Sequence, residues 1–163
     1  DLLAFSRTTS RAVPFETVQG DLVFKNAAEA LADKIETSQA VITKNALPEI
    51  LCDGKQISQV FQNLLANAIK FHSEEKPRIH VDCIKNESEW IFSVKDNGIG
   101  FEQQYADKIF QLFQRLEGKS EYPGTGIGLS ICKKIVNNHR GLIFANATPG
   151  KGATFSIILP KNL

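Results

Sequence analysis

Residues 56–72, QISQVFQNLLANAIKFH, form the most restrictive pattern in the chain. Apolar residues recur there every three or four positions, which is typical of an amphipathic helix with one face buried against another layer. Asp53 stands just before the pattern and is the expected N-cap. The apolar positions are Ile57, Val60, Phe61, Leu64, Leu65 and Ala68.

Three polar residues border the apolar face of this helix. Asn63, Asn67 and Lys70 are spaced i, i+4 and i+7, so they fall within an arc of roughly 60°. Amide oxygens and an ammonium group suit a Mg²⁺–phosphate group, because Mg²⁺ takes oxygen ligands and the lysine offsets phosphate charge. The alternative is a solvated helix flank, which is the more frequent outcome for such a segment taken alone.

The remaining segments mix helix and strand patterns, which predicts an α/β two-layer sandwich with one sheet covered on one face by helices. Strands are expected at 13–20, 40–43, 49–52, 78–84, 90–95, 142–147 and 153–159, with 40–43 and 49–52 joined at Leu47-Pro48. Helices are expected from the N-cap Asp21 through residue 38, around IFQLFQRL, and from GIGLSICKKIVNNH to Gly141.

Composition excludes several classes of protein. The 163 residues suit one domain, and 19 Lys and Arg against 18 Asp and Glu leave a formal charge of +1. This balance argues against a basic nucleic-acid binder and against a protein held on a membrane by charge. The chain has no apolar run of membrane-spanning length, and its polar start without Met leads us to expect a boundary inside a longer protein. The three cysteines form no CxxC pair and fit buried thiols in a reducing compartment.

The segment DNGIG follows a strand of alternating apolar residues. A carboxylate at the end of a strand, here Asp96, can accept a hydrogen bond from the amine of adenine, where guanine would present an oxygen. Gly98 and Gly100 allow the backbone to approach a flat base closely and permit a positive φ. The alternative is a plain hairpin turn, but a helical pattern follows instead of a strand.

The segment GTGIGL runs into a helix. Glycine-rich backbone at a helix N-terminus can cradle phosphate through its N–H groups, which makes Gly124, Thr125, Gly126, Gly128 and Leu129 candidates for phosphate contact. A dinucleotide-binding fingerprint would need a strand before the glycines and a parallel strand after the helix. Here a polar, proline-containing stretch precedes the glycines and a hairpin follows, so we discard that alternative.

The segments NLLANAIKFH, DNGIG, IFQLFQR and GTGIGLSICKKIV occur in one order that resembles the N, G1, F and G2 boxes of the GHKL ATPase/kinase superfamily. Within it, the chain is similar to histidine kinases of the type found downstream of PAS, GAF or phytochrome-like sensors. The resemblance covers about residues 13–160, and the closing GKGATFSIILP looks like the family's last hairpin. Residues 1–12 look like the end of the dimerisation and phosphoacceptor helix with a linker, which leaves 13–163 as the catalytic domain.

The resemblance implies the Bergerat fold, with a mixed sheet covered on one face by helices and ATP bound beneath a mobile lid. It implies that Asn67 helps to hold Mg²⁺, with Asn63 and Lys70 near the phosphates. It also implies that Asp96 contacts the adenine amine. The lid would span residues 115–125, with Phe110 and Phe113 anchoring its start and Arg115 reaching the γ-phosphate. Gly98 and Gly100 would shape the base pocket, and Thr154 would lie close to Asp96 and the adenine.

The residue at position 63 separates two enzyme classes. Hydrolytic relatives such as gyrase carry a Glu four residues before the metal-binding Asn, whereas Asn63 cannot act as a general base. The resemblance therefore implies a protein-histidine kinase in which Asn63, Lys70 and Arg115 assist transfer to a histidine of the companion dimerisation domain. The alternatives are a GHKL-type ATPase and a non-catalytic nucleotide-sensing module.

The family pattern also sets expectations about partners. None of His72, His80 and His139 lies in a phosphoacceptor box or shares a spacing with carboxylates or thiols, so we expect no metal or triad role for them. The expected partners are the protein's own dimerisation domain and a response regulator receiver domain, with no nucleic acid. We expect a cytoplasmic domain, monomeric alone, in a full-length homodimer that is cytoplasmic or membrane-anchored. One departure is Arg140, which stands near a helix end where the family usually has Gly.

Overall fold

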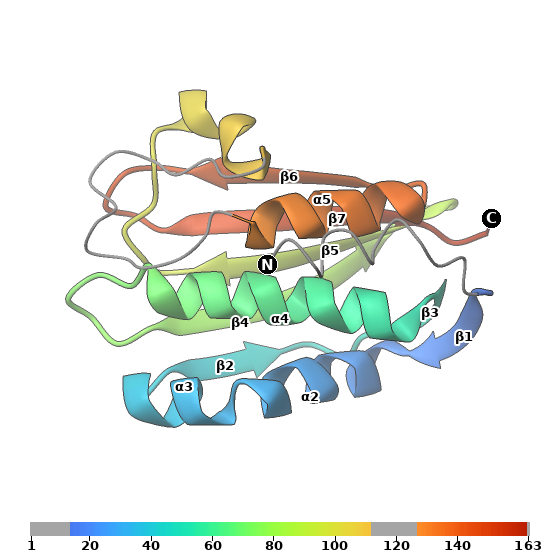
Figure 1. Ribbon diagram of the computed structural model, residues 1–163, viewed down its shortest axis with the longest axis horizontal. Coiled ribbons are helices and arrows are strands. Elements are labelled where there is room, and N and C mark those ends of the chain that lie inside the picture. Colours follow the sequence, from blue (N-terminus) through green and yellow to red (C-terminus); the bar gives the residue numbers. More distant parts are fainter. Residues whose placement is uncertain (1–13, 112–126, 163) are drawn as a thin grey trace.

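The computed structural model describes residues 14–111 and 127–162, in which helices lie over one face of a five-stranded sheet (Figure 1). The helices are α2 (Gly20–Ala30), α3 (Ala32–Ser38), α4 (Gly54–Lys70) and α5 (Gly128–Asn138). The strands of the sheet are β2 (Val41–Lys44), β4 (Arg78–Lys85), β5 (Glu89–Asp96), β6 (Leu142–Ala147) and β7 (Ala153–Pro160). The predicted α/β two-layer sandwich is confirmed.

The sheet is mixed. Its strand order is β2-β4-β5-β7-β6, in which β2 runs parallel to β4 and the other neighbours are antiparallel. A separate antiparallel pair joins β1 (Glu16–Gln19) to β3 (Glu49–Cys52). The two predicted strands on either side of Leu47-Pro48 therefore exist but belong to different sheets.

Alternation along β5 and β7 divides the sheet into a covered and an uncovered face. Phe92, Val94, Phe155 and Ile157 are buried on the helix side, where Phe92 meets Phe61 of α4 edge to face at 5.7 Å. The residues between them point to the opposite face. On that face Lys95, Thr154 and Asn146 lie side by side in register across β5, β7 and β6.

Helix α4 begins as the sequence predicts. The Asp53 carboxylate accepts hydrogen bonds from the backbone N–H groups of Lys55 and Gln56, which satisfies donors that the helix cannot pair internally. The buried residues of α4 are Ile57, Val60, Phe61, Leu64, Leu65, Ala68 and Ile69, which include every apolar position predicted for this face.

The prediction of one helix capped by Asp21 and running to residue 38 was wrong in two respects. Its N-cap is Gln19 without a side-chain bond, because the Asp21 carboxylate instead accepts from the Leu47 backbone N–H and the Lys44 ammonium. These two partners, Lys44 first, lower the pKa of Asp21. The helix also breaks at Leu31, whose ψ of 13° departs from helical geometry and separates α2 from α3.

The segment between β5 and α5 contains two short 3₁₀ turns, η1 (Gln103–Tyr105) and η2 (Lys108–Phe110). The second turn carries the first residues of IFQLFQRL, and the rest of that predicted helical piece lies outside the described residues. No strand follows DNGIG until β6, so within the described chain the plain-hairpin alternative for that segment fails.

His139 is the C-cap of α5 and is almost fully buried, at 2% exposure. Its Nε2 accepts a hydrogen bond from the backbone N–H of Asp53 at 3.1 Å, so Nδ1 carries the proton that is donated to the Ile135 carbonyl at 2.8 Å. The ring also stacks on Phe15 at 4.4 Å. The neutral imidazole thus joins the end of α5 to the start of α4.

Burial lowers the pKa of His139, which predicts that acid destabilises the fold. Because the unfolded chain binds this proton more readily than the folded chain, the free energy of unfolding is fully retained above the ordinary histidine pKa of about 6.5 and declines as the pH falls below it. Urea denaturation of the unmodified protein and of His139→Gln, at a series of pH values from about 7.5 to 5, should show a shallower decline in the variant. Equal slopes would contradict the assignment.

Arg140 follows His139 in a left-handed conformation, with φ of 58°. The Arg140 N–H bonds the Asn137 carbonyl and the Gly141 N–H bonds the Val136 carbonyl, which is the Schellman pattern that ends many helices. Glycine adopts this conformation without strain, whereas a side chain brings Cβ against the backbone. The family departure at position 140 is therefore a strained helix end.

Arg140→Gly should raise the free energy of unfolding by about 1 kcal/mol, because it removes the left-handed strain. Chemical denaturation of the two proteins measures the difference. Arg140→Ala is the matched control, since it removes the same side chain and keeps Cβ. An equal gain in both variants would mean that the side chain, and not the backbone, is the source.

Candidate nucleotide-binding site

The end of α4, the end of β5 and the start of α5 meet at one end of the sheet, on the left in Figure 1. The Ile99 N–H donates to the Phe71 carbonyl at 2.9 Å, which joins the DNGIG turn to the residue after α4. The three segments that the sequence singled out, which are the polar edge of α4, DNGIG and the start of α5, therefore contribute to one region. This region is the candidate for the described part of the predicted nucleotide site.

Asn63 connects α4 to α5. Its Nδ2 donates to the Gly128 carbonyl at 3.2 Å, and its side chain lies near the thiol of Cys132, which donates to the Val60 carbonyl. That thiol is fully buried, and burial raises the pKa of Cys132 to about 12. Asn63 thus holds the first turn of α5 beside α4, while Leu129, the next residue, packs against the core.

Asn67 and Lys70 lie on the same half-buried edge of α4 as Asn63. The Lys70 ammonium stands 5.1 Å from the centroid of the Phe71 ring, within reach of a cation–π contact. The side-chain amide of Asn67 has no hydrogen-bond partner among the described residues. One neutral oxygen and one cation therefore stand a turn apart along the same edge.

Asp96 ends β5 with one carboxylate oxygen engaged and one available. Its Oδ1 accepts from the Gly98 N–H at 2.8 Å and from the Ala153 N–H at 3.2 Å. Burial raises the pKa of Asp96, and these two N–H groups act in the opposite direction. Among the described residues no hydrogen bond reaches the other oxygen, Oδ2.

Gly98 and Gly100 are both required, for different reasons. A Cβ on Gly98 would lie 2.4 Å from the Phe71 carbonyl oxygen, so a side chain would push the turn away from α4. Gly100 has φ of 63°, and a Cβ there would lie 2.2 Å from the Thr148 carbonyl oxygen. The expected positive φ is present at Gly100. The close neighbour of each glycine is protein backbone, and the approach to a base stays a prediction.

A cavity of about 540 Å³ opens at the same end of the sheet, beside the β6–β7 turn. Thr154 lines it together with Asp96, but Thr154 points to the uncovered face with Lys95. Ala153 is the β7 residue that bonds Asp96. The other lining residues are Gln103, Asn146, Ala147, Thr148, Lys151 and Gly152. A role of Thr154 near adenine stays a prediction.

Several predicted site residues cannot be placed. Phe113, Arg115, Gly124, Thr125 and Gly126, with the lid expected at 115–125, lie outside the described residues. Phe110 is described and packs edge to face on Phe155 at 6.1 Å, which is a core contact.

Two residues at the site were not singled out from the sequence. Asn97 forms hydrogen bonds with Lys76 and Arg78, at the end of the loop that follows α4. Gly152 lies against the Asp96 carbonyl oxygen, which would be 2.1 Å from a Cβ on residue 152. For Gly152 the signal was the repeated glycine in PGKG. For Asn97 the sequence offered only a position within a turn.

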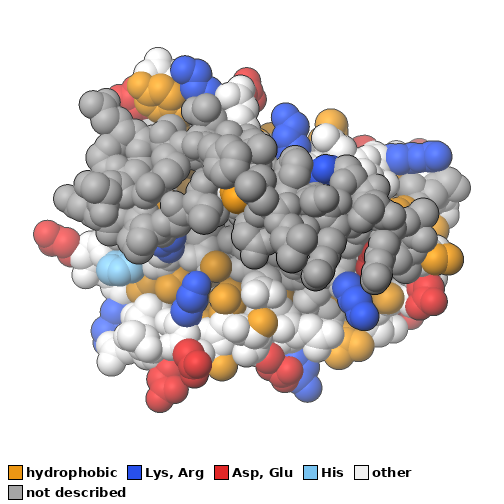
Figure 2. All heavy atoms as spheres, viewed as in Figure 1, with side chains coloured by type: hydrophobic (Ala, Val, Ile, Leu, Met, Phe, Trp, Pro, Cys, Tyr) orange, Lys and Arg blue, Asp and Glu red, His pale blue; other side chains and the backbone are white. Residues whose placement is uncertain are grey.

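The described surface carries no broad basic area on the face seen in Figure 2, where Lys and Arg are interspersed with Asp and Glu. In residues 14–111 and 127–162, no group of three His, Cys, Asp or Glu could hold a metal ion. Within the same ranges no helix is long and apolar enough to cross a membrane. Cys52, Cys83 and Cys132 are all free, with Cys83 only half-buried.

Comparison with known proteins identifies the class. Residues 52–163 match the family of histidine kinase-, DNA gyrase B- and HSP90-like ATPases, and the chain belongs to this family. The matched range contains the α4, DNGIG and α5 segments.

Curated relatives narrow the class to sensor kinases. The chain is 46% identical over 160 residues to cyanobacterial phytochrome A of Nostoc sp. and 39% identical over 160 residues to the phytochrome-like protein Cph1 of Synechocystis sp.. Each alignment covers 98% of this chain and 21% of the relative, so the chain spans about a fifth of their length. The alginate biosynthesis sensor protein KinB of Pseudomonas aeruginosa is 33% identical, with 98% of this chain and 27% of KinB covered.

Solved structures share the fold. The nucleotide-free catalytic domain of histidine kinase ThkA superposes with a TM-score of 0.77 at 25% identity, covering 91% of this chain and 99% of that domain. Full-length ShkA superposes with a TM-score of 0.82 at 24% identity, covering 98% of this chain and 34% of ShkA. The fold is that of the ATP-binding catalytic domain of sensor histidine kinases, as the sequence resemblance implied.

Proposed function

We propose that this chain binds Mg²⁺-ATP and transfers the γ-phosphate to a histidine on the dimerisation domain of the same sensor kinase. The observation that carries the proposal is Asn63, which has an amide in place of a hydrolytic base and donates to the Gly128 carbonyl. With an amide at position 63, the polar edge of α4 formed by Asn63, Asn67 and Lys70 has no carboxylate that could activate water. A nucleophile has to come from another domain.

The base-binding end is supported by Asp96. Its free Oδ2 is a hydrogen-bond acceptor suited to the adenine amine, and its Oδ1 is held by Gly98 and Ala153. A guanine oxygen in the same place would face a carboxylate oxygen, and neither atom could donate. The family description, which names ATPases, supports ATP as the nucleotide.

The phosphate-binding end is supported by Asn67 and Lys70. A free amide oxygen fits the oxygen-only ligand preference of Mg²⁺, which completes its shell with water and phosphate. When bound, Mg²⁺ neutralises charge on the phosphate oxygens. Lys70 adds a cation on the same edge of α4, and Arg115 and the glycines at 124–126 are proposed to assist from the segment outside the described residues.

The transfer needs only alignment and an acceptor. The lone pair of an imidazole nitrogen forms the new P–N bond while the bond from the γ-phosphorus to the bridging oxygen breaks, and ADP leaves with those electrons. The imidazole N–H proton passes to solvent. This chain's residues would orient the triphosphate and supply no proton acceptor.

The relatives support the proposed partners. ThkA has been solved in complex with the response regulator TrrA, and ShkA in complex with AMPPNP. We propose a receiver domain as the next phosphate acceptor and a homodimeric full-length protein whose catalytic domain is cytoplasmic. Residues 1–12 would link to the dimerisation helix, with the catalytic domain from 13 onward.

Asp96→Asn should weaken ATP binding by about 1–3 kcal/mol, because the variant can present an amide donor to the adenine amine. Calorimetric titration of the unmodified protein with Mg²⁺-ATP and Mg²⁺-GTP should also show a strong preference for ATP. Equal affinity for the two nucleotides would refute the assignment of Asp96.

Mixed with the separate dimerisation domain, the chain should transfer ³²P from γ-labelled ATP to a histidine, giving an acid-labile and base-stable product. Asn67→Ala should abolish the transfer by removing a Mg²⁺ contact, and Asn63→Ala should weaken it without releasing inorganic phosphate. Asn26→Ala, an exposed asparagine on α2, is the control and should transfer normally. Rapid ATP hydrolysis by the unmodified chain, lost in Asn63→Ala, would favour the ATPase alternative.

A further inference from the structure

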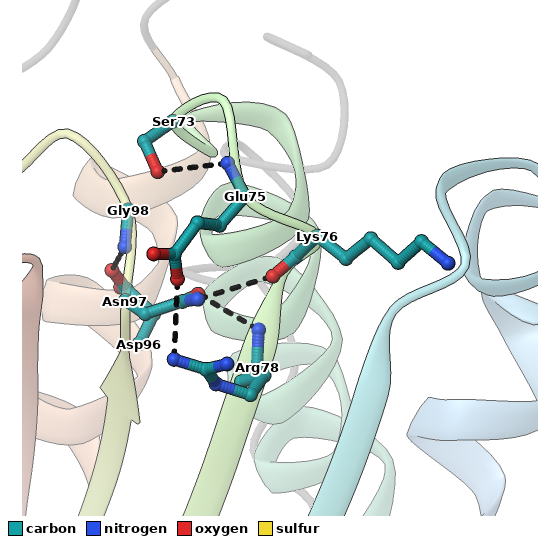
Figure 3. Close-up of polar contacts among 7 residues, drawn as sticks. All are labelled: Ser73, Glu75, Lys76, Arg78, Asp96, Asn97 and Gly98. Carbon is teal, nitrogen blue, oxygen red and sulfur yellow. Dashed lines mark hydrogen bonds and ion pairs between the residues drawn. The ribbon is translucent and has the colours of Figure 1, made fainter.

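The Asn97 side chain bonds main-chain atoms of the loop between α4 and β4 (Figure 3). Its Oδ1 accepts from the Arg78 N–H at 2.8 Å, and its Nδ2 donates to the Lys76 carbonyl at 3.1 Å. The β4–β5 register pairs Ile79 with Asp96, so Asn97 stands opposite Arg78. The Asn97 side-chain amide thus adds one more pair of hydrogen bonds to those that join β4 and β5.

The side-chain hydrogen bonds of this loop lie at the surface, and those of Asn97 do so too. Glu75 and Arg78 form an ion pair at 3.2 Å with both side chains 67% exposed, and the Ser73 hydroxyl accepts from the Glu75 N–H at 3.4 Å. Exposed ion pairs contribute little, because water screens them and the side chains lose entropy. At the far end of the loop the Pro77 carbonyl accepts from the Val41 N–H of β2, and the two Asn97 bonds tie this end to the DNGIG turn.

The neighbours of Asn97 hold the near end of the same loop. The Ile99 N–H bonds the Phe71 carbonyl, and Gly98 approaches that carbonyl so closely that no side chain fits. Phe71 directly follows α4. Three consecutive residues, 97–99, thus clamp both ends of the loop to the strand that ends in Asp96.

We propose that Asn97 is a positioning residue that fixes the end of α4, with Asn67 and Lys70, relative to Asp96. A nucleotide held at its base by Asp96 and at its phosphates by α4 needs both groups at one separation. Asp96 keeps its own bonds to Gly98 and Ala153 when Asn97 is removed, so the base end would survive while alignment with the phosphate end is lost. This inference rests on the proposed function.

The test compares two dissociation constants for each protein by calorimetry: ADP in EDTA, which depends mainly on the base end, and ATP with Mg²⁺, which needs both ends. Asn97→Ala should leave the ADP constant within about twofold and reduce the additional affinity for Mg²⁺-ATP by about fivefold or more. Asn97→Asp is isosteric and keeps the acceptor for the Arg78 N–H but not the donor to Lys76, so it should lose part of that additional affinity. It also serves if Asn97→Ala does not fold.

Asn86→Ala is the matched control. Asn86 bonds the backbone N–H groups of Ser88 and Glu89 in the β4–β5 hairpin, and should change neither constant. Parallel weakening of ADP and Mg²⁺-ATP in the Asn97 variants, or no change in a folded variant, would overturn the positioning role. Absence of ADP binding by the unmodified protein would instead overturn the proposed function, and this inference with it.

Discussion

Burial of one face of α4 against the sheet is the constraint on which the site depends. Ile57, Val60, Phe61, Leu64 and Leu65 are each no more than 1% exposed. Burying a side chain of this kind contributes about 1.5–3 kcal/mol, so the helix cannot rotate or slide without a large loss. Because the polar edge of the helix borders that buried face, its orientation is fixed by the core and not by any ligand.

Each end of α4 is held by a hydrogen bond between a main-chain group and an uncharged partner. At its start, the Asp53 N–H donates to the neutral ring of His139, and at its end the Phe71 carbonyl accepts from Ile99. Such bonds are insensitive to salt, unlike exposed ion pairs. The helix is therefore fixed to α5 at one end and to the DNGIG turn at the other, and these are the elements that a nucleotide would have to bridge.

The sequence correctly predicted the features that depend on neighbouring residues, such as helix periodicity and the N-cap of α4. The apolar periodicity located α4, Asp53 caps it, and the positive φ allowed for the DNGIG glycines is present at Gly100. Contacts between distant segments were beyond that reasoning. Asp21 looked like an N-cap until Leu47 and Lys44, more than twenty residues away, competed for its carboxylate.

Asn97 shows the same limit within the site. Its partners, Lys76 and Arg78, are about twenty residues earlier in the chain, and only the pairing of β4 with β5 brings them together. The sequence indicates two neighbouring strands at 78–84 and 90–95, but it does not give the exact register that places Asn97 opposite Arg78. The residues that would contact a ligand were therefore easier to propose than the residue that sets their separation.

The amide at position 63 does more than lack basicity. Its Nδ2 points a donor at the Gly128 carbonyl, 3.2 Å away, in the first turn of α5. A carboxylate in the same rotamer would face that carbonyl with two acceptors and no hydrogen between them, which is repulsive. A hydrolytic Glu at this position would need α5 to shift or its own side chain to turn away. The amide at position 63 is thus coupled to how α5 packs on α4, so Asn63→Glu would change this contact as well as introduce a base.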